Sequence, residues 1–93
     1  MHEDIGKEEI TELFSQYDFI IKDIDIIEEE NLANVYIVVG DTDLYRIVAI
    51  DNVIKKIKEM EGELINEGMI EYIMFGDLYQ GIWRILIYFK KEE

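Results

Sequence analysis

Residues 82–89 read Ile-Trp-Arg-Ile-Leu-Ile-Tyr-Phe, and this stretch decides the expected fold. Its β-branched and aromatic residues favour a strand, and alternate residues of a strand point to opposite faces of the sheet. Apolar side chains then lie on both faces: Trp83, Ile85, Ile87 and Phe89 on one, and Ile82, Arg84, Leu86 and Tyr88 on the other. We therefore expect a sheet that is apolar on both sides.

The residues before this strand complete a hairpin. Residues 69–75 form its other strand, and residues 76–81, Gly-Asp-Leu-Tyr-Gln-Gly, form the connecting loop because glycine and aspartate favour turns. Alternation again divides the strand into two largely apolar sets: Ile70, Tyr72 and Met74 against Met69, Glu71, Ile73 and Phe75.

Three further strands are expected in the first half of the chain. Residues 19–27 and 35–39 are rich in isoleucine and valine, which are enriched in strands. Residues 40–43, Gly-Asp-Thr-Asp, have the composition of a turn. Residues 45–50 follow this turn and are interpreted as the third strand of a meander.

Two segments have the apolar spacing of amphipathic helices. The first begins at Asp4, a suitable N-cap, and its buried stripe is Ile10, Leu13, Phe14 and Tyr17. The second begins at the N-cap Asp51 and ends at Gly68, and its stripe is Val53, Ile54, Ile57, Met60, Leu64 and Ile65. An alternative stays open, in which Thr42 or Asp43 caps one long helix that runs to Asn66.

The predicted fold is a single two-layer α+β domain over residues 1–93, with the element order α-β-β-β-α-β-β. Its five-stranded sheet is mainly antiparallel and has both helices on one face. Two short helices cover only one face, so the other is an exposed apolar surface of the kind that binds proteins. The economical occupant is a second copy, which predicts a homodimer. The alternative is a monomer in which the helices lie on both faces.

Tyr36, Arg84 and Tyr88 are of residue types enriched at the hot spots of protein interfaces, and they are expected at this interface together with neighbouring apolar residues. The full set is Tyr36, Val38, Arg84, Leu86 and Tyr88 on the sheet face, with Leu78 and Tyr79 in the hairpin loop.

The charge is strongly negative, with 22 acidic and 9 basic residues and a formal net charge of −13. Residues 1–34 hold eleven carboxylates and two lysines, or −9, and residues 35–93 hold eleven carboxylates and seven basic groups, or −4. Such a field repels nucleic-acid phosphates and anionic membranes, so neither is expected as a direct partner. It attracts basic proteins, although high charge also serves solubility alone.

The residues that support catalysis or metal binding are few. Cysteine is absent, and the one histidine is His2, at the start of the chain. Asp23 and Asp25 point to the same strand face and are the best candidate for a shared divalent cation, but the next strand, residues 35–39, lacks the third carboxylate that such sites use. The acids of 28–30 and 40–43 are explained by solvated turns. No catalytic residue, metal or cofactor is expected.

The sequence therefore predicts a cytoplasmic, non-catalytic interaction module that acts as a regulator, adaptor or chaperone-like protein. Enrichment in isoleucine, glutamate and lysine without proline is typical of a thermophilic source, or of a genome rich in A and T. One alternative is an acidic mimic of nucleic acid that inhibits a basic DNA- or RNA-binding protein, as viral anti-defence proteins do. Another is a metal-dependent phosphoryl-transfer enzyme that uses Asp23 and Asp25.

Overall fold

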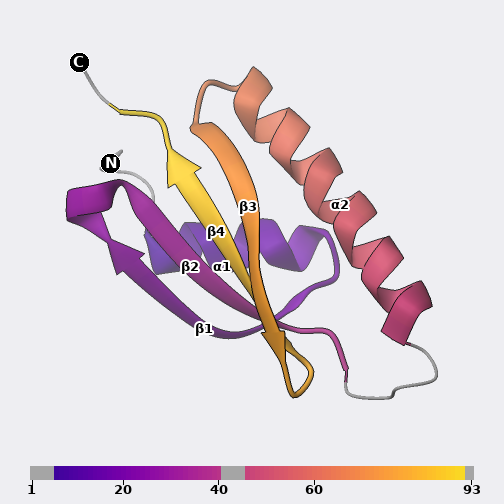
Figure 1. Cartoon of the computed structure of the whole chain (residues 1–93). Helices are drawn as coiled ribbons and strands as arrows, with labels where there is room; N and C mark the ends of the chain where they lie inside the picture. The colour runs from indigo at the N-terminus through magenta and orange to yellow at the C-terminus, as the bar shows by residue number, and fades with distance from the viewer. Residues whose placement is uncertain (1–5, 41–45, 92–93) are drawn as a thin grey trace.

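The computed structural model describes residues 6–40 and 46–91, with the backbone alone for 46–49 (Figure 1). These residues form an α+β fold with two α-helices and one four-stranded antiparallel sheet. In chain order the elements are α1 (Lys7–Gln16), β1 (Ile20–Ile27), the 3-10 helix η1 (Glu28–Glu30), β2 (Leu32–Val38), α2 (Arg46–Asn66), β3 (Ile70–Tyr79) and β4 (Ile82–Phe89).

The strands lie in the order β1-β2-β4-β3, so β1 and β3 are the edges. The chain leaves the sheet after β2, passes through α2, and returns as the edge strand β3. A tight hairpin then inserts β4 between β3 and β2. β2 and β4 each have a neighbouring strand on both sides, so β4, whose sequence decided the expected fold, lies in the middle of the sheet.

The expected strand at residues 45–50 is wrong, and the sheet has four strands rather than five. Residues 46–50 are the first turns of α2. Their β-branched residues favoured a strand, yet Ile50 lies three residues before Val53 and seven before Ile57, on the same helical stripe. Burial of that stripe against the sheet outweighs local strand propensity. The long-helix alternative is therefore confirmed from residue 46, and its caps Thr42 and Asp43 lie outside the described residues.

The expected loop at residues 76–81 is also wrong, because β3 continues to Tyr79. The turn is only Gln80-Gly81, whose φ angles of 50° and 78° are those of a type I′ hairpin turn. Gly76 lies inside the strand at an irregularity in the β3–β4 register. A Cβ there would lie 2.9 Å from Nε of Arg84 and 2.9 Å from Cδ1 of Leu86. Glycine is present because the two strands approach closely, and not because the chain turns.

Both helices pack on one face of the sheet. Figure 1 shows α1 crossing behind the strands and α2 running along β3. Their buried side chains join the inward side chains of all four strands in one core cluster. Its fully buried larger members are Phe14, Ile37, Ile57, Met60, Ile85, Ile87 and Val35. Neither helix in the described part of the chain is long and apolar enough to cross a membrane.

The helix ends follow local rules. The Glu9 carboxylate accepts a hydrogen bond of 2.6 Å from the backbone N–H of Gly6, which is the N-cap of α1. The expected cap Asp4 lies outside the described residues. Gly68, with φ of 74°, follows the end of α2 as expected, and its N–H donates to the carbonyl of Ile65.

The end of α1 is tied to α2 through Tyr17. The Nζ of Lys56 donates to the Tyr17 carbonyl at 3.1 Å and lies 5.6 Å from the centre of the Phe19 ring. The Tyr17 hydroxyl donates a hydrogen bond to Glu63. This bond, followed by burial and by the charges of Glu63 and other acids of the same region, raises the pKa of Tyr17 to about 12.

Removal of the Glu63 charge is expected to lower the pKa of Tyr17 towards its ordinary value of 10.0. Because the folded state holds the proton more tightly than the unfolded state, this link stabilises the fold fully below pH 10 and is lost as the pH rises towards 12. Carbon NMR of ring-labelled tyrosine would follow the titration of Tyr17 in the native protein and in Glu63→Gln. A Tyr17 that titrates alike in both proteins would contradict the assigned cause.

Candidate functional site

The sheet face opposite the helices is the candidate site, and we call it the open face. The strand register places its side chains in four rows that cross the sheet. From β1 through β2 and β4 to β3, the rows are Ile27-Leu32-Tyr88-Tyr72, Asp25-Asn34-Leu86-Met74, Asp23-Tyr36-Arg84 and Ile20-Val38-Ile82-Tyr79. Most of these side chains are apolar or aromatic.

No described helix or loop covers the open face. The core cluster and the half-buried residues packed against it contain none of its members. Six large hydrophobic residues of the described chain are exposed, and five of them lie here. They are Ile20, Val38, Tyr72, Met74 and Tyr79, exposed by 67, 39, 45, 48 and 69%; the sixth is Ile65 on α2. Their concentration on one surface distinguishes it from the scattered apolar residues of ordinary surfaces.

One end of the open face, the row from Ile27 to Tyr72, is packed by its own side chains. The Tyr72 and Tyr88 rings stack across β3 and β4 with their centres 4.6 Å apart and their planes 24° apart. Leu32 lies beside Tyr88 on β2 and is 6% exposed although no helix covers it. Aromatic rings that pack together in the absence of a partner form a preorganised surface, which lowers the entropic cost of binding.

Asn34 is a buried polar residue near the centre of this surface. It lies between Asp25 of β1 and Leu86 of β4 and is 5% exposed. Its side-chain Oδ1 is buried and has no hydrogen-bond partner among the described residues. An acceptor left in this state costs about 1–3 kcal/mol, so the free chain has an unmet hydrogen bond in the middle of the open face.

The charged groups of the open face lie on the edge strand β1 and in the row that contains Arg84. Asp23 and Asp25 are exposed on the edge strand β1. Nε of Arg84 is 2.9 Å from Oδ1 of Asp77. A hydrogen bond from its own backbone and this bond from Arg84 lower the pKa of Asp77. The central row from Asn34 to Met74 has no ionised group on β2, β4 or β3.

The edges of the sheet are less suited to binding than its face. At β3, Oε2 of Glu61 accepts a hydrogen bond of 2.7 Å from the backbone N–H of Ile73, and Nε1 of Trp83 donates to the carbonyl of Gly76 at 2.9 Å. At β1, Oδ1 of Asp23 accepts from the N–H of Ile24 at 2.9 Å, next to an irregularity in the register. Satisfied backbone groups, charges and bulges all oppose strand addition.

The structure places six of the seven expected interface residues on the open face: Tyr36, Val38, Arg84, Leu86, Tyr88 and Tyr79. Leu78 does not lie there. It pairs with Trp83 on the side that faces the helices and packs against the core. Leu78 and Tyr79 both belong to β3 and not to a loop. Because adjacent residues of a strand point to opposite faces of the sheet, Tyr79 lies on the open face and Leu78 does not.

Sequence reasoning missed other members of this surface: Ile20, Leu32, Asn34, Tyr72 and Met74. Tyr72 and Met74 had been grouped with Ile70, but an irregularity in the register between Ile70 and Tyr72 sends these two to the open face while Ile70 is buried in the core. A bulge at Glu71 has no signal in residue type. Leu32 and Asn34 were missed because the strand expected from the sequence began only at residue 35, whereas β2 begins at Leu32.

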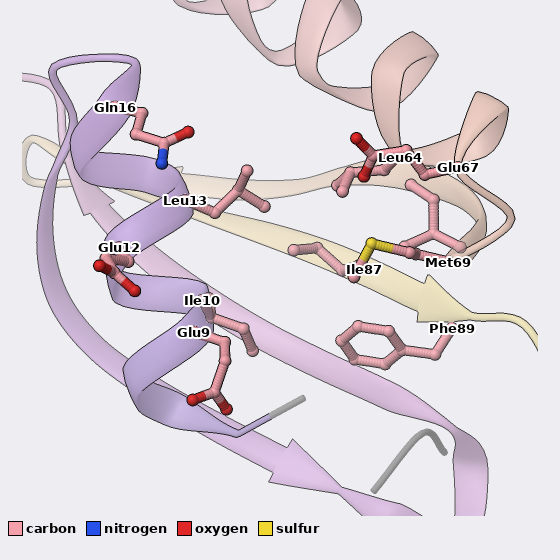
Figure 2. Close-up of a pocket in the computed structure, with 11 residues that line it drawn as sticks. Glu9, Ile10, Glu12, Leu13, Gln16, Leu64, Glu67, Met69, Ile87 and Phe89 are labelled. Carbon is pink, nitrogen blue, oxygen red and sulfur yellow. The ribbon is translucent and has the colours of Figure 1, made fainter. Parts of the chain in front are cut away.

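A second candidate site is a pocket on the opposite side of the molecule, between α1 and the end of α2 (Figure 2). We call it the helix pocket, and its cavity volume is about 230 Å³. Apolar side chains from both helices, from the connection after α2, and from β3 and β4 line it: Ile10, Leu13, Leu64, Met69, Ile70, Ile87 and Phe89. Carboxylates of Glu9, Glu12 and Glu67 complete the lining together with Gln16, which is its one uncharged polar side chain.

Asp23 and Asp25 lie on the same face of β1, as expected from their spacing, opposite Tyr36 and Asn34. Within residues 6–40 and 46–91 there is no group of three or more histidine, cysteine, aspartate or glutamate side chains placed to hold a metal. Of the expected turn at residues 40–43, residues 41–43 lie outside this part of the chain.

Comparisons with protein-family models, with curated proteins and with solved structures found no match for this chain.

Proposed function

We propose that the protein is a non-catalytic interaction module that forms a homodimer by packing the open face against the same face of a second copy. The observation that supports this most is the concentration of five of the six exposed large hydrophobic residues on one uncovered sheet face. Removal of this apolar surface from water would stabilise a complex. Two sheets packed face to face are a common way to bury such surfaces.

The size of the open face fits a modest dimer. Four strands spaced about 4.8 Å apart, with about seven residues each, give a face of roughly 19 by 24 Å. Side chains such as Tyr79 and Met74 stand above this plane and add accessible area. Two copies would bury on the order of 1,200 Å² in total, the lower end of the range for stable complexes.

The distribution of charge also favours a second copy. Most described acids lie away from the open face, on α1, η1 and α2. Face-to-face packing therefore brings no carboxylates together at the centre of the interface. The net charge of −13 on each copy still repels at long range, so dimerisation should strengthen with salt, which screens this repulsion.

The proposal is tested by a pair of matched substitutions. Met74 lies on the open face and is 48% exposed, and Ile65 lies on α2 and is 46% exposed. Met74→Lys should weaken dimerisation at least about tenfold, because it places an unpaired charge in an apolar interface. Ile65→Lys introduces the same charge elsewhere and should leave the dimer unchanged. Sedimentation velocity over a range of concentrations and salt measures both.

Met74 and Ile65 are both exposed in the free chain, so both variants should fold. A loss of dimerisation can therefore be distinguished from a loss of folding. A native protein that sediments as a monomer at every concentration would reject the homodimer. Equal weakening in Met74→Lys and Ile65→Lys would place the interface elsewhere. Circular dichroism of each variant verifies that the fold is intact.

A further inference from the structure

We propose that the helix pocket binds a basic protein through one apolar side chain flanked by lysine or arginine. The pocket is a separate site from the open face, and its occupant differs in chemistry from a second copy of this chain. Three features support the assignment: the size of the cavity, the apolar character of its floor and the sign of the charges around it.

The cavity volume of about 230 Å³ suits a single side chain. Ligand sites for drug-sized molecules are usually about 300–1,000 Å³, whereas a cavity of about 150 Å³ accepts a benzene ring. A leucine, methionine or phenylalanine side chain therefore fits without rearrangement. Figure 2 shows Leu13 on α1 and Ile87 on β4 facing the same space, with Met69 and Phe89 beside it. The walls come from the two helices and the sheet, so the pocket is held by the core of the fold.

The charges determine which apolar group is favoured. Glu12 of α1 and Glu67, directly after α2, both belong to the lining of the pocket. Glu9 is a third acid in the lining, and the lining has no lysine or arginine among the described residues. A wholly apolar ligand gains nothing from these carboxylates, and an acidic one is repelled. A side chain with cationic neighbours gains both apolar burial and ion pairing.

The position of the pocket leaves it available in the homodimer. It lies on the side of the sheet that the helices cover, opposite the open face. A face-to-face dimer would therefore present two helix pockets on its two outer surfaces. Two weak sites on one dimer give higher overall affinity for a partner with repeated basic segments, which suits an adaptor.

The test uses three synthetic peptides and the full-length protein. The first peptide is a lysine-rich amphipathic sequence with one central phenylalanine, the second has alanine in place of phenylalanine, and the third has glutamate in place of each lysine. Methyl NMR would report on Leu13, Leu64 and Ile87 during each titration. We expect the first peptide to shift these signals and to bind more weakly as salt rises. The other two should bind at least about tenfold more weakly.

Paired substitutions locate the charges. Glu12→Gln with Glu67→Gln removes two charges at the pocket, and Asp51→Asn with Glu59→Gln removes two exposed charges elsewhere. The pocket pair should weaken the first peptide by about three- to tenfold, and the control pair by less than twofold. Glu9 is left unchanged because it caps α1.

Several results would overturn the proposal. Equal binding of the phenylalanine and alanine peptides would show that the cavity is not used. Equal effects of the two charge-removing pairs would show only a general attraction to the acidic protein. Contacts from another segment of the same chain to the Leu13 and Ile87 methyl groups would show that the chain fills its own pocket. None of these results depends on whether the protein dimerises, which sedimentation measures separately.

Discussion

Replacing Phe14 with alanine is expected to lower the free energy of unfolding by about 3–5 kcal/mol, the usual cost of removing a buried phenylalanine. Phe14 is 0% exposed, and its ring lies 5.9 Å from that of Phe19. It joins α1 to the core that α2 and the sheet share. Small domains are stable by only about 5–15 kcal/mol. The substitution should therefore remove much of the stability, which urea titration at low protein concentration would measure.

Ile65→Ala is the control for this measurement. Ile65 is 46% exposed and lies outside the core cluster, and alanine favours helices. Its free energy of unfolding should stay within about 0.5 kcal/mol of the native value. A cost for Phe14→Ala no larger than that of Ile65→Ala would mean that α1 does not pack against the sheet as described.

The helices show how well apolar spacing predicts burial. In α1, the stripe expected from sequence contains Ile10 and Phe14, which are buried, and Leu13 and Tyr17, which are half-buried. The signal is reliable because a helix of this length needs one apolar face to be stable. In α2, burial follows the same stripe, with the exception of Ile65. The regular helical spacing of apolar residues thus explains why the burial of these side chains could be predicted from the sequence.

The errors have a different origin, since each depended on an interaction between distant residues. Gly76 was interpreted as part of a turn, yet glycine is needed there because Arg84 and Leu86 lie close by. The bulge at Glu71 depends on pairing with β4 and reversed the face of Ile70 relative to Tyr72. The burial of Asn34 depends on its neighbours across the sheet. Rules based on neighbouring residues in the sequence cannot predict contacts between residues on different strands.

The apolar character of the two sheet faces was nevertheless correctly anticipated, because it follows from the alternation in β4 alone. Ile85 and Ile87 are buried under the helices, while Leu86 and Tyr88 are half-exposed on the open face. The loss of the expected fifth strand leaves this conclusion intact. Residues 46–50 joined α2 instead, which lengthens a helix on the side that was already covered.

Asn34→Asp is expected to have the second large effect, and its size should depend on pH. The substitution keeps the shape of the side chain and introduces an ionisable group that is buried beside Asp25. Burial and the like charge of Asp25 both favour the neutral form, so the pKa of the new carboxyl in the folded state should rise above the unfolded value of about 3.9. Below about pH 4, folded and unfolded chains are both protonated and the penalty is absent.

Above that pH the penalty grows by about 1.4 kcal/mol for each unit until the folded-state pKa is reached, and then stays constant. With a shift of about two to three units, the variant should be less stable than the native protein by about 3–4 kcal/mol at pH 8, relative to pH 4. Urea titrations of both proteins across this range measure the difference. Asp25→Asn in the same variant should reduce the penalty by removing the like charge.

Asn34→Leu is the control, because it removes the amide without adding a charge. It should show the pH dependence of the native protein, and it should raise the stability of the free chain, since Oδ1 of Asn34 has no partner among the described residues. If the amide instead bonds across the dimer, Asn34→Leu should lose this gain at concentrations where the protein dimerises. An Asn34→Asp variant with native pH dependence would mean that water reaches the centre of the open face, and the surface would then be too polar to serve as a dry interface.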